Sequence, residues 1–285
     1  MSTIDQFESV FKSAIKEPFV FGSPAFKNIL IVTDLKKKEA DTFSDKIQKL
    51  LGFLSDGLKV KYEIVAGKEF NSTEELLKIV DKKKPDLICT YRNLHSNAWK
   101  FPHSLGEYLD VLLQKVDYPV LLLPHPNAGY AYDHAFDGVN NVMAITSHLS
   151  NEHRLVNYAA KFTQKKGSLC LAHIEDETYF KRVIDAISKI PAIDTNDAEV
   201  LIKEKLLSNA SDYIQSCSTV LKKHYDIKIK NIVKFGHHLN HYRTHIEGKK
   251  INLLVMNTKD EDQMAMHGLA YPLAVELRQI SLLML

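Results

Sequence analysis

Short apolar runs separated by longer amphipathic stretches set the pattern of this chain. The runs KNILIVTDL (Lys27–Leu35) and NNVMAITSHL (Asn140–Leu149) begin with polar residues and end in Thr followed by a small polar residue. Such runs are typical of strands buried on both faces, as in parallel sheets. The amphipathic stretches between the runs predict helices. Their alternation therefore predicts an α/β protein with right-handed crossovers.

The order of these elements occurs twice. Lys59–Tyr91 and Asp226–Thr258 each give an alternating strand, a glycine, a helix, a basic turn and a buried strand. Leu105–Pro124 and His267–Leu285 each give a glycine, an amphipathic helix and a short apolar strand. Matching order over three blocks predicts two related Rossmann-like lobes with parallel, five-stranded-type sheets.

The lobes differ in the middle. The second has an extra strand at Ser168–Asp176 and a long helical region that continues to about His224, so we expect the first lobe to be truncated by one strand and one helix. A helix at about Ile4–Ile15 is expected to cover the vacated face. The predicted units are the N-terminal helix packing on lobe one (1–26), the shortened lobe one (27–124), a linker rich in Pro and Gly (125–138) and lobe two (139–285).

The last strand of each lobe, PVLLLP and SLLML, is short and apolar. A bare apolar edge strand promotes aggregation and is normally paired or covered. We therefore expect the two last strands to pair with each other, which makes the chain an intramolecular pseudo-dimer of lobes. A further homodimer of whole chains remains open.

Composition and charge narrow the class of protein. The 285 residues are 45% hydrophobic and carry a net charge of +2, which argues against an electrostatic nucleic-acid binder. No apolar stretch approaches the ~20 residues of a membrane span, and the N-terminus lacks the apolar centre of a signal peptide. The three cysteines form no close pair. We expect a cytoplasmic protein without disulfides or membrane partners.

The blocks resemble two successive copies of the universal stress protein family. In the second lobe, VMAITSHL resembles the family's first strand, LAHIED with His173 resembles the second, and KFG, a helix and LLVMNT resemble the segment before its phosphate loop. The resemblance covers about Lys27 to Leu285 apart from the linker. It implies an adenine nucleotide alpha hydrolase-like fold, a role in the stress response, and fifth strands that pair across a dimer.

The nucleotide-binding loops depart from the family's pattern. Nucleotide-binding members carry Gly-x-x-Gly, nine residues, then Gly-Ser or Gly-Thr, and the glycines let backbone N–H groups close on phosphates. Counting back from Gly106, the loop glycines become Asn93 and Ser96, while counting forward from Asp86 they become Tyr91 and Leu94. Glu107 replaces the hydroxyl residue, and its charge would repel phosphate.

The second lobe departs in the same way. Asn257 and Asp260 stand at the glycine positions, and Leu269 follows Gly268. The family's first strand ends in an Asp that contacts the nucleoside; lobe one keeps it as Asp34, although this residue could instead cap the next helix. Ser147 replaces it in lobe two. The candidate ligand-binding residues are therefore Asp34, Tyr91, Asn93, Ser96, Gly106, Glu107, Ser147, Asn257 and Gly268.

A histidine-rich segment offers separate chemistry. His237, His241 and His245 recur every four residues, so they share one face of a helix and could chelate zinc. The alternative is a solvated histidine face, because Leu239, Tyr242 and Ile246 supply the apolar side. The loop 93–104 carries the single tryptophan, Trp99. Trp99 and Phe101 either pack over the sheet edge or against the other lobe, or the loop lines a surface for a small ligand or partner.

No catalytic signature is recognisable in the sequence. The leading expectation is a non-catalytic stress-response or regulatory binding protein that does not bind ATP tightly and needs no cofactor. One alternative is an adenine-nucleotide-binding protein that uses lobe one for ATP or AMP, with weak ATPase activity or none. A second alternative is a metal binder that holds zinc through the His237 to His245 helix.

Overall fold

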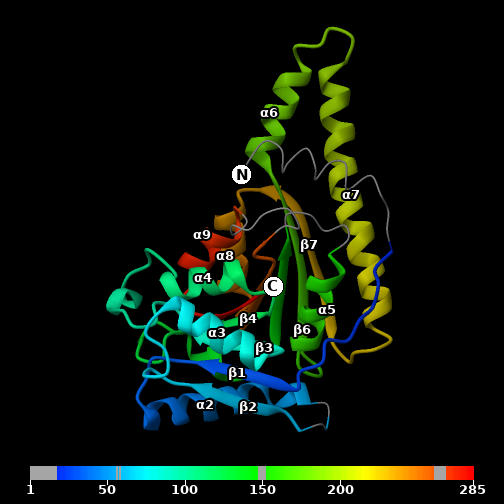
Figure 1. Ribbon diagram of the computed structural model, residues 1–285. Helices are drawn as coiled ribbons and strands as arrows, with labels where there is room; N and C mark the ends of the chain where they lie inside the picture. The colour runs from blue at the N-terminus through cyan, green and yellow to red at the C-terminus, as the bar shows by residue number, and fades with distance from the viewer. Residues whose placement is uncertain (1–17, 56, 58, 147–151, 260–267) are drawn as a thin grey trace.

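The computed structural model describes residues 18–55, 57, 59–146, 152–259 and 268–285, and Figure 1 shows their arrangement. They form a nine-stranded sheet in the order β2-β1-β3-β4-β9-β8-β5-β6-β7. The strands are β1 (Asn28–Val32), β2 (Lys61–Val65), β3 (Leu87–Tyr91), β4 (Val120–Leu123), β5 (Asn141–Thr146), β6 (Ser168–Asp176), β7 (Lys228–Gly236), β8 (Leu253–Met256) and β9 (Ser281–Met284).

Helices connect these strands and cover the sheet. The first lobe holds α2 (Lys37–Leu51), α3 (Thr73–Lys83) and α4 (Glu107–Lys115); the second holds α5 (His153–Phe162), α6 (Glu177–Ile187), α7 (Thr195–Leu221), α8 (His238–Gly248) and α9 (Ala270–Glu276). Short 3-10 turns are η1 (Gly52–Ser55), η2 (Asn97–Lys100) and η3 (Asp133–Phe136). The predicted α/β class is confirmed.

The two lobes meet at their last strands. β4 and β9 pair antiparallel, with Leu121 opposite Leu283, whereas all other strand pairs are parallel. Every residue of both strands is buried. The expected pairing through the last strands is confirmed, and it removes the two apolar edges from solvent. One cluster of buried apolar side chains runs through both lobes.

The first lobe is one strand shorter than the second, as expected, but within the described residues it lacks counterparts of two helices, α6 and α7, where one was expected. Its block Lys59–Tyr91 resembles the block that contains β7, yet β2 pairs directly with β1, whereas β6 separates β7 from β5. β2 therefore takes the sheet position that β6 has in the second lobe. Both β2 and β7 are edge strands with partly exposed faces, which gives them similar alternating sequences.

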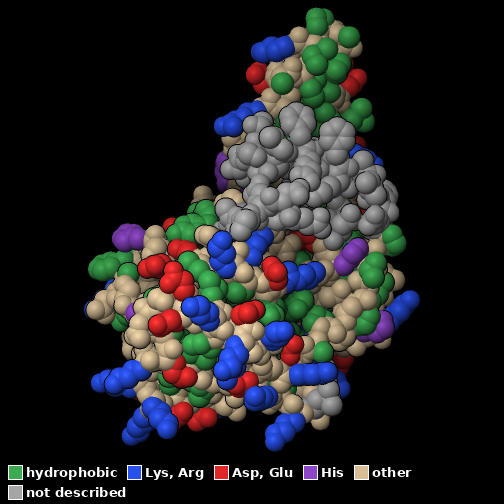
Figure 2. Space-filling view, in the orientation of Figure 1, with side chains coloured by type: hydrophobic (Ala, Val, Ile, Leu, Met, Phe, Trp, Pro, Cys, Tyr) green, Lys and Arg blue, Asp and Glu red, His purple; other side chains and the backbone are tan. Residues whose placement is uncertain are grey.

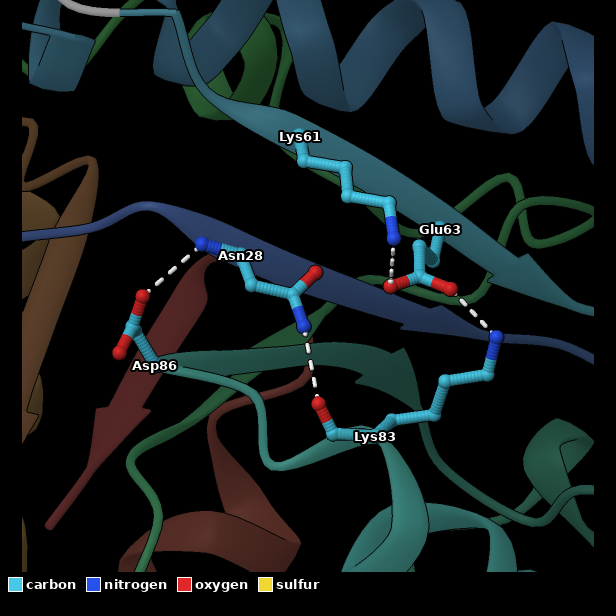
Figure 3. Close-up of polar contacts among 5 residues, drawn as sticks. All are labelled: Asn28, Lys61, Glu63, Lys83 and Asp86. Atoms are coloured by element: carbon cyan, nitrogen blue, oxygen red, sulfur yellow. Dashed lines mark hydrogen bonds and ion pairs between the residues drawn. The ribbon is translucent and has the colours of Figure 1, made fainter.

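Polar side chains connect β1, β2 and the segment before β3 near the ends where these strands begin (Figure 3). Glu63 of β2 forms ion pairs with Lys61 at 2.8 Å and with Lys83 at the end of α3. Asp86 Oδ2 accepts a hydrogen bond from the amide of Asn28 at 2.8 Å, and Asn28 Nδ2 donates to the Lys83 carbonyl at 3.0 Å. These contacts tie α3 and its neighbouring strands to β1.

Residues 18–26 run along the second lobe. Asn157 of α5 accepts a hydrogen bond from the Gly22 amide at 3.0 Å and donates one to the Val20 carbonyl at 3.0 Å. The helix expected at 4–15 lies outside the described residues, so its packing on the first lobe stays a prediction. The segment that follows it packs on the other lobe.

Helices α6 and α7 form a hairpin that projects from the body of the molecule (Figure 1). The buried residues of α7 all lie at or beyond Ala210, so its first half stands clear of the core. Large apolar side chains are exposed around the tip, where they gather in Figure 2: Ile190, Ile193, Val200 and Leu201. Within the described residues, no helix combines the length and apolarity that crossing a membrane requires. Cys89, Cys170 and Cys217 are buried and free.

Candidate functional site

The candidate site of the first lobe lies where β1, β2 and β3 end. These strands are adjacent and parallel, so the residues after them converge at one edge of the sheet, the usual ligand edge of such folds. The structure brings Asp34 and Tyr91 together there. The Tyr91 hydroxyl donates to Asp34 Oδ1, and it lies 2.6 Å from Thr33 Oγ1 and 3.1 Å from the Asp34 amide, which donates to it.

Asp34 has a second partner in the loop after β3. Its Oδ2 accepts a hydrogen bond from the His95 amide at 2.8 Å. Asn93 and His95 both have positive φ, 58° and 57°, which turns the loop back toward β1. The alternative role of Asp34 as a helix cap is wrong, because the N-cap of α2 is Lys36 and no side chain caps it. Both carboxylate oxygens of Asp34 therefore serve the fold.

The loop after β3, where the resemblance to universal stress proteins would place phosphates, is closed on itself. The Asn93 amide donates to the Leu105 carbonyl at 2.8 Å, and the Asn93 side chain exchanges hydrogen bonds with Ser104, each 3.2 Å long. Gly106 has a φ of +92°, and a Cβ there would lie 2.7 Å from Asn93 Cα. Glycine is needed at this position because the backbone approaches Asn93 closely. The conformational freedom of Gly106 therefore allows the loop to close.

The other two candidates in this loop are placed at its surface. Ser96 is exposed, and its hydroxyl accepts a hydrogen bond from the Ala98 amide at 3.1 Å, which caps η2. Glu107 is the first residue of α4 and is exposed. An acidic side chain in the first turn of a helix is stabilised by the helix dipole. This position therefore offers a phosphate a negative charge instead of a hydroxyl.

A cavity of about 800 Å³ opens beside Asp34, between the end of β1, the start of α2 and the end of β2. Its wall carries both signs of charge, from the side chains of Asp34, Lys36, Lys37, Asp41, Lys68 and Glu69. Gly67 allows the wall to form, since a Cβ there would lie 2.4 Å from the Asp34 carbonyl oxygen. Gly67 is the glycine expected between the strand and the helix of the block Lys59–Tyr91, but the sequence pattern did not indicate a cavity there.

Aromatic rings cover the inner side of the Tyr91 network. Trp99 stacks on His125 with ring centroids 4.3 Å apart, and His125 meets Tyr91 edge-on at 4.7 Å. Burial lowers the pKa of His125 to about 4, although the negative charge of Asp34 opposes the shift. Trp99 therefore packs against His125 of the linker, a contact that was not among its expected roles, whereas Phe101 remains 57% exposed.

The second lobe shows only part of its predicted site. Ser147 lies outside the described residues, as does Asp260. Asn257 is half-buried after β8, and Gly268 is exposed in the turn before α9. A pair that the sequence did not single out as a site lies at the end of β6, where His173 Nε2 is 2.7 Å from Glu175 Oε1.

The histidine-rich segment forms the end of β7 and the helix α8. His237 is the N-cap, His241 Nδ1 accepts a hydrogen bond from Lys234 Nζ at 3.0 Å, and His245 is half-buried. Burial and the nearby charges of Lys234 and Lys249 lower the pKa of His245. Within the described ranges, no group of three or more His, Cys, Asp or Glu side chains is arranged to hold a metal ion. Zinc binding by these histidines stays a prediction.

Comparison with known proteins identifies the fold. No protein-family model and no curated protein matches the sequence. Among solved structures, a protein assigned to the universal stress proteins, from Pseudomonas aeruginosa UCBPP-PA14, is 12% identical and superposes with a TM-score of 0.52 over 92% of this chain and 94% of its own. This likeness shows that the chain has the fold of that protein, which agrees with the resemblance seen in the sequence.

Two further structures align over similar lengths. A functionally unknown protein from Pseudomonas aeruginosa PAO1 is 13% identical, with a TM-score of 0.49 over 92% of this chain and 93% of its own. A universal stress protein from Archaeoglobus fulgidus DSM 4304 is 12% identical, with a TM-score of 0.48 over 92% of this chain and 97% of its own.

Proposed function

We propose that this chain is a regulatory binding protein of the universal stress protein type that takes a small ligand in the first-lobe cavity and does not bind ATP tightly. The observation that carries the proposal is the state of Asp34. Its carboxylate accepts hydrogen bonds from the Tyr91 hydroxyl and the His95 amide. A ribose hydroxyl would have to compete with both contacts.

The loop after β3 supports the same conclusion. A phosphate site needs backbone N–H groups that point into open space. The Asn93 amide already donates a hydrogen bond to the Leu105 carbonyl, and the Ala98 amide donates one to the Ser96 hydroxyl. Glu107 adds a negative charge at the start of α4. A triphosphate in this place would meet occupied donors and a like charge.

Isothermal titration calorimetry with ATP and Mg²⁺ tests the proposal. We expect no binding with micromolar affinity. A micromolar dissociation constant would overturn it. If ATP does not bind, mass spectrometry of small molecules that co-purify with the native protein would identify the ligand of the cavity.

A second candidate function is binding of adenosine or AMP without a seated triphosphate. The cavity favours it, because about 800 Å³ lies within the usual range of small-molecule sites and Asp34 is on its wall. Ala66→Trp would fill the cavity and leave the hydrogen bonds of Asp34 in place. Adenosine binding that Ala66→Trp abolishes would support this candidate; absence of adenosine binding in the unmodified protein would remove it.

The contact between the lobes supports a further part of the proposal. The β4–β9 pair lies inside one chain, so each lobe can serve as the other's partner. We propose that the two lobes act as an intramolecular pseudo-dimer. Sedimentation analysis of the whole chain would determine whether a homodimer forms in addition.

A further inference from the structure

Arg92 crosses the junction between the two lobes. It follows β3 in the first lobe, and its guanidinium caps the end of α9 in the second. Nε donates to the Ala274 carbonyl at 3.0 Å, and Nη2 donates to the carbonyls of Ala274 at 2.6 Å and Leu277 at 2.9 Å. The side chain is fully buried, with 1% of its surface exposed. Its third nitrogen, Nη1, is buried and has no hydrogen-bond partner among the residues that the structure describes.

A second arginine lies at the same junction. Arg278 follows α9, and its Nη1 lies 3.4 Å from the carbonyls of Trp99 and Lys100 in the first lobe. Its guanidinium stacks on the ring of Tyr130, 4.6 Å from the centroid. Arg278 Nε and the Tyr130 hydroxyl are both buried, and neither has a hydrogen-bond partner in the described part of the chain. The first lobe and the linker thus meet the end of α9 here, and Arg278 and Tyr130 are both close enough to Arg92 to interact with it electrostatically.

These donors have no counter-charge among the described residues. None of the ion pairs in that part of the chain includes Arg92 or Arg278. Burial and the positive charge of Arg278 lower the pKa of Arg92 to about 10, although Tyr130 opposes the shift. Burying a guanidinium without a charged partner is costly, and carbonyl oxygens compensate only partly. The arrangement fits a missing anion.

We propose that Arg92 Nη1, Arg278 Nε and the Tyr130 hydroxyl form a binding site for a phosphate-type oxyanion at the lobe junction. An acceptor-only ligand with several oxygens suits donors that approach from different segments, and guanidinium groups match phosphate oxygens well. Two positive charges suit a doubly charged anion. Arg278 and Tyr130 are half-buried, so their side of the site lies nearest to solvent. This site is separate from the first-lobe cavity, whose wall contains none of the three residues.

Two variants separate ligand binding from folding. Tyr130→Phe removes only a hydroxyl that has no hydrogen-bond partner within the described ranges, so we expect the protein without ligand to keep its stability. Arg278→Gln removes the half-buried guanidinium and leaves the contacts of Arg92 to α9. Arg243→Gln, which removes an exposed positive charge on α8, is the matched control for net charge.

The experiment compares sodium phosphate with sodium chloride at constant ionic strength, by thermal denaturation and by calorimetry. Phosphate at about tenfold its dissociation constant should raise the Tm by about 2–4 °C. Arg278→Gln and Tyr130→Phe should each weaken phosphate binding by about tenfold or more, since a lost hydrogen bond to a charged group costs at least this much. Arg243→Gln and the cavity-filling Ala66→Trp should bind phosphate as the unmodified protein does.

O-phosphoserine distinguishes free phosphate from a phosphoryl group carried by a larger molecule. Binding of either compound that depends on Arg278 and Tyr130 supports the site, and the tighter of the two identifies the source. Equal Tm values in phosphate and chloride, together with no calorimetric binding of phosphoserine, would overturn the proposal. Binding that both variants retain would overturn it as well.

Discussion

The Tyr91 hydroxyl joins the end of β3 to the end of β1 by donating a hydrogen bond to Asp34 Oδ1. The same oxygen accepts from the Asp34 amide at 3.1 Å and lies 2.6 Å from Thr33 Oγ1, so the phenol uses its proton and both lone pairs. Burial raises the pKa of Tyr91, and the nearby Asp34 carboxylate adds to the shift. The network places a fixed phenol at the mouth of the first lobe.

Tyr91→Phe should destabilise the protein by about 1–3 kcal/mol, because it leaves buried polar partners without their shared hydroxyl. Urea denaturation measures the change in the free energy of unfolding. Tyr225→Phe is the matched control, since the Tyr225 hydroxyl is buried and has no hydrogen-bond partner among the described residues. We expect that control to stay within about 0.5 kcal/mol of the unmodified protein. Equal losses in the two variants would contradict a special role for the Tyr91 network.

His125 should give the stability of the protein a specific dependence on pH. Its folded pKa of about 4 lies below the unfolded value of about 6.5, so only the unfolded chain takes up a proton in between. Stability is therefore fully present above pH ~6.5 and falls as the pH drops toward 4, by at most about 3 kcal/mol. His125→Asn keeps an acceptor for the Asn127 amide, which donates to His125 Nδ1 at 3.2 Å.

Denaturation of both proteins at pH 7.5 and pH 4.5 tests this prediction. Carboxylates contribute to the acid side of both curves, so the difference between the two slopes isolates His125. We expect the His125→Asn variant to lose less stability over this range. His103→Asn, at an exposed position, should keep the slope of the unmodified protein. Equal slopes for His125→Asn and the unmodified protein would show that His125 titrates normally.

Sequence patterns predicted which segments form strands better than they predicted which strands lie side by side in the sheet. The run Leu87–Tyr91 is apolar on both faces and became β3, which is fully buried. The position of β2 beside β1 was not predictable, because edge strands with one solvated face share alternating patterns wherever they pair. Its likeness to β7 therefore indicated the kind of strand and not its place in the sheet.

The candidate site was predictable to a similar extent. Asp34, Tyr91 and Gly106 were found because strand ends and glycines can be read from the chain. Loop closure depends on single backbone angles, such as the positive φ of Asn93, and no local pattern indicates these. Contacts across the lobe junction, such as Arg92 to Ala274, join residues far apart in the sequence and need the fold itself.

The ion pairs of Glu63 should contribute modestly and only above acidic pH (Figure 3). Hydrogen bonds from Lys61 and Lys83 lower the pKa of Glu63, so their contribution is present above its unfolded pKa and is lost as the pH falls through the lower folded value. Glu63→Gln should cost about 0.2–1 kcal/mol at pH 7 and nothing measurable at pH 2–3. High salt should reduce the difference at pH 7. A constant difference at all pH values would mean that packing, and not charge, causes the loss.

The exposed apolar tip of the α6–α7 hairpin should tolerate charge. Val200 and Leu201 are 55% and 64% exposed, so Val200→Glu with Leu201→Glu should change the free energy of unfolding by less than about 1 kcal/mol. Leu221→Ala at the buried end of the same helix should cost about 2–5 kcal/mol. Denaturation measures both, and sedimentation velocity of the double variant also tests whether the tip holds chains together. A large loss in the double variant would show that the tip is covered.

Gly106→Ala should separate backbone strain from steric conflict in the closed loop. Gly57 and Gly106 both have positive φ, +80° and +92°, so alanine is strained at either position. Nothing lies within 4 Å of a Cβ at Gly57, whereas a Cβ at Gly106 would lie 2.7 Å from Asn93 Cα. Gly57→Ala should therefore cost about 1 kcal/mol and Gly106→Ala clearly more, about 2–4 kcal/mol. Because Asn93 must move to admit the methyl group, a crystal structure of Gly106→Ala should show its contact with Ser104 broken. Equal costs at the two glycines would mean that the loop yields without resistance, and its closure could then not exclude a phosphate.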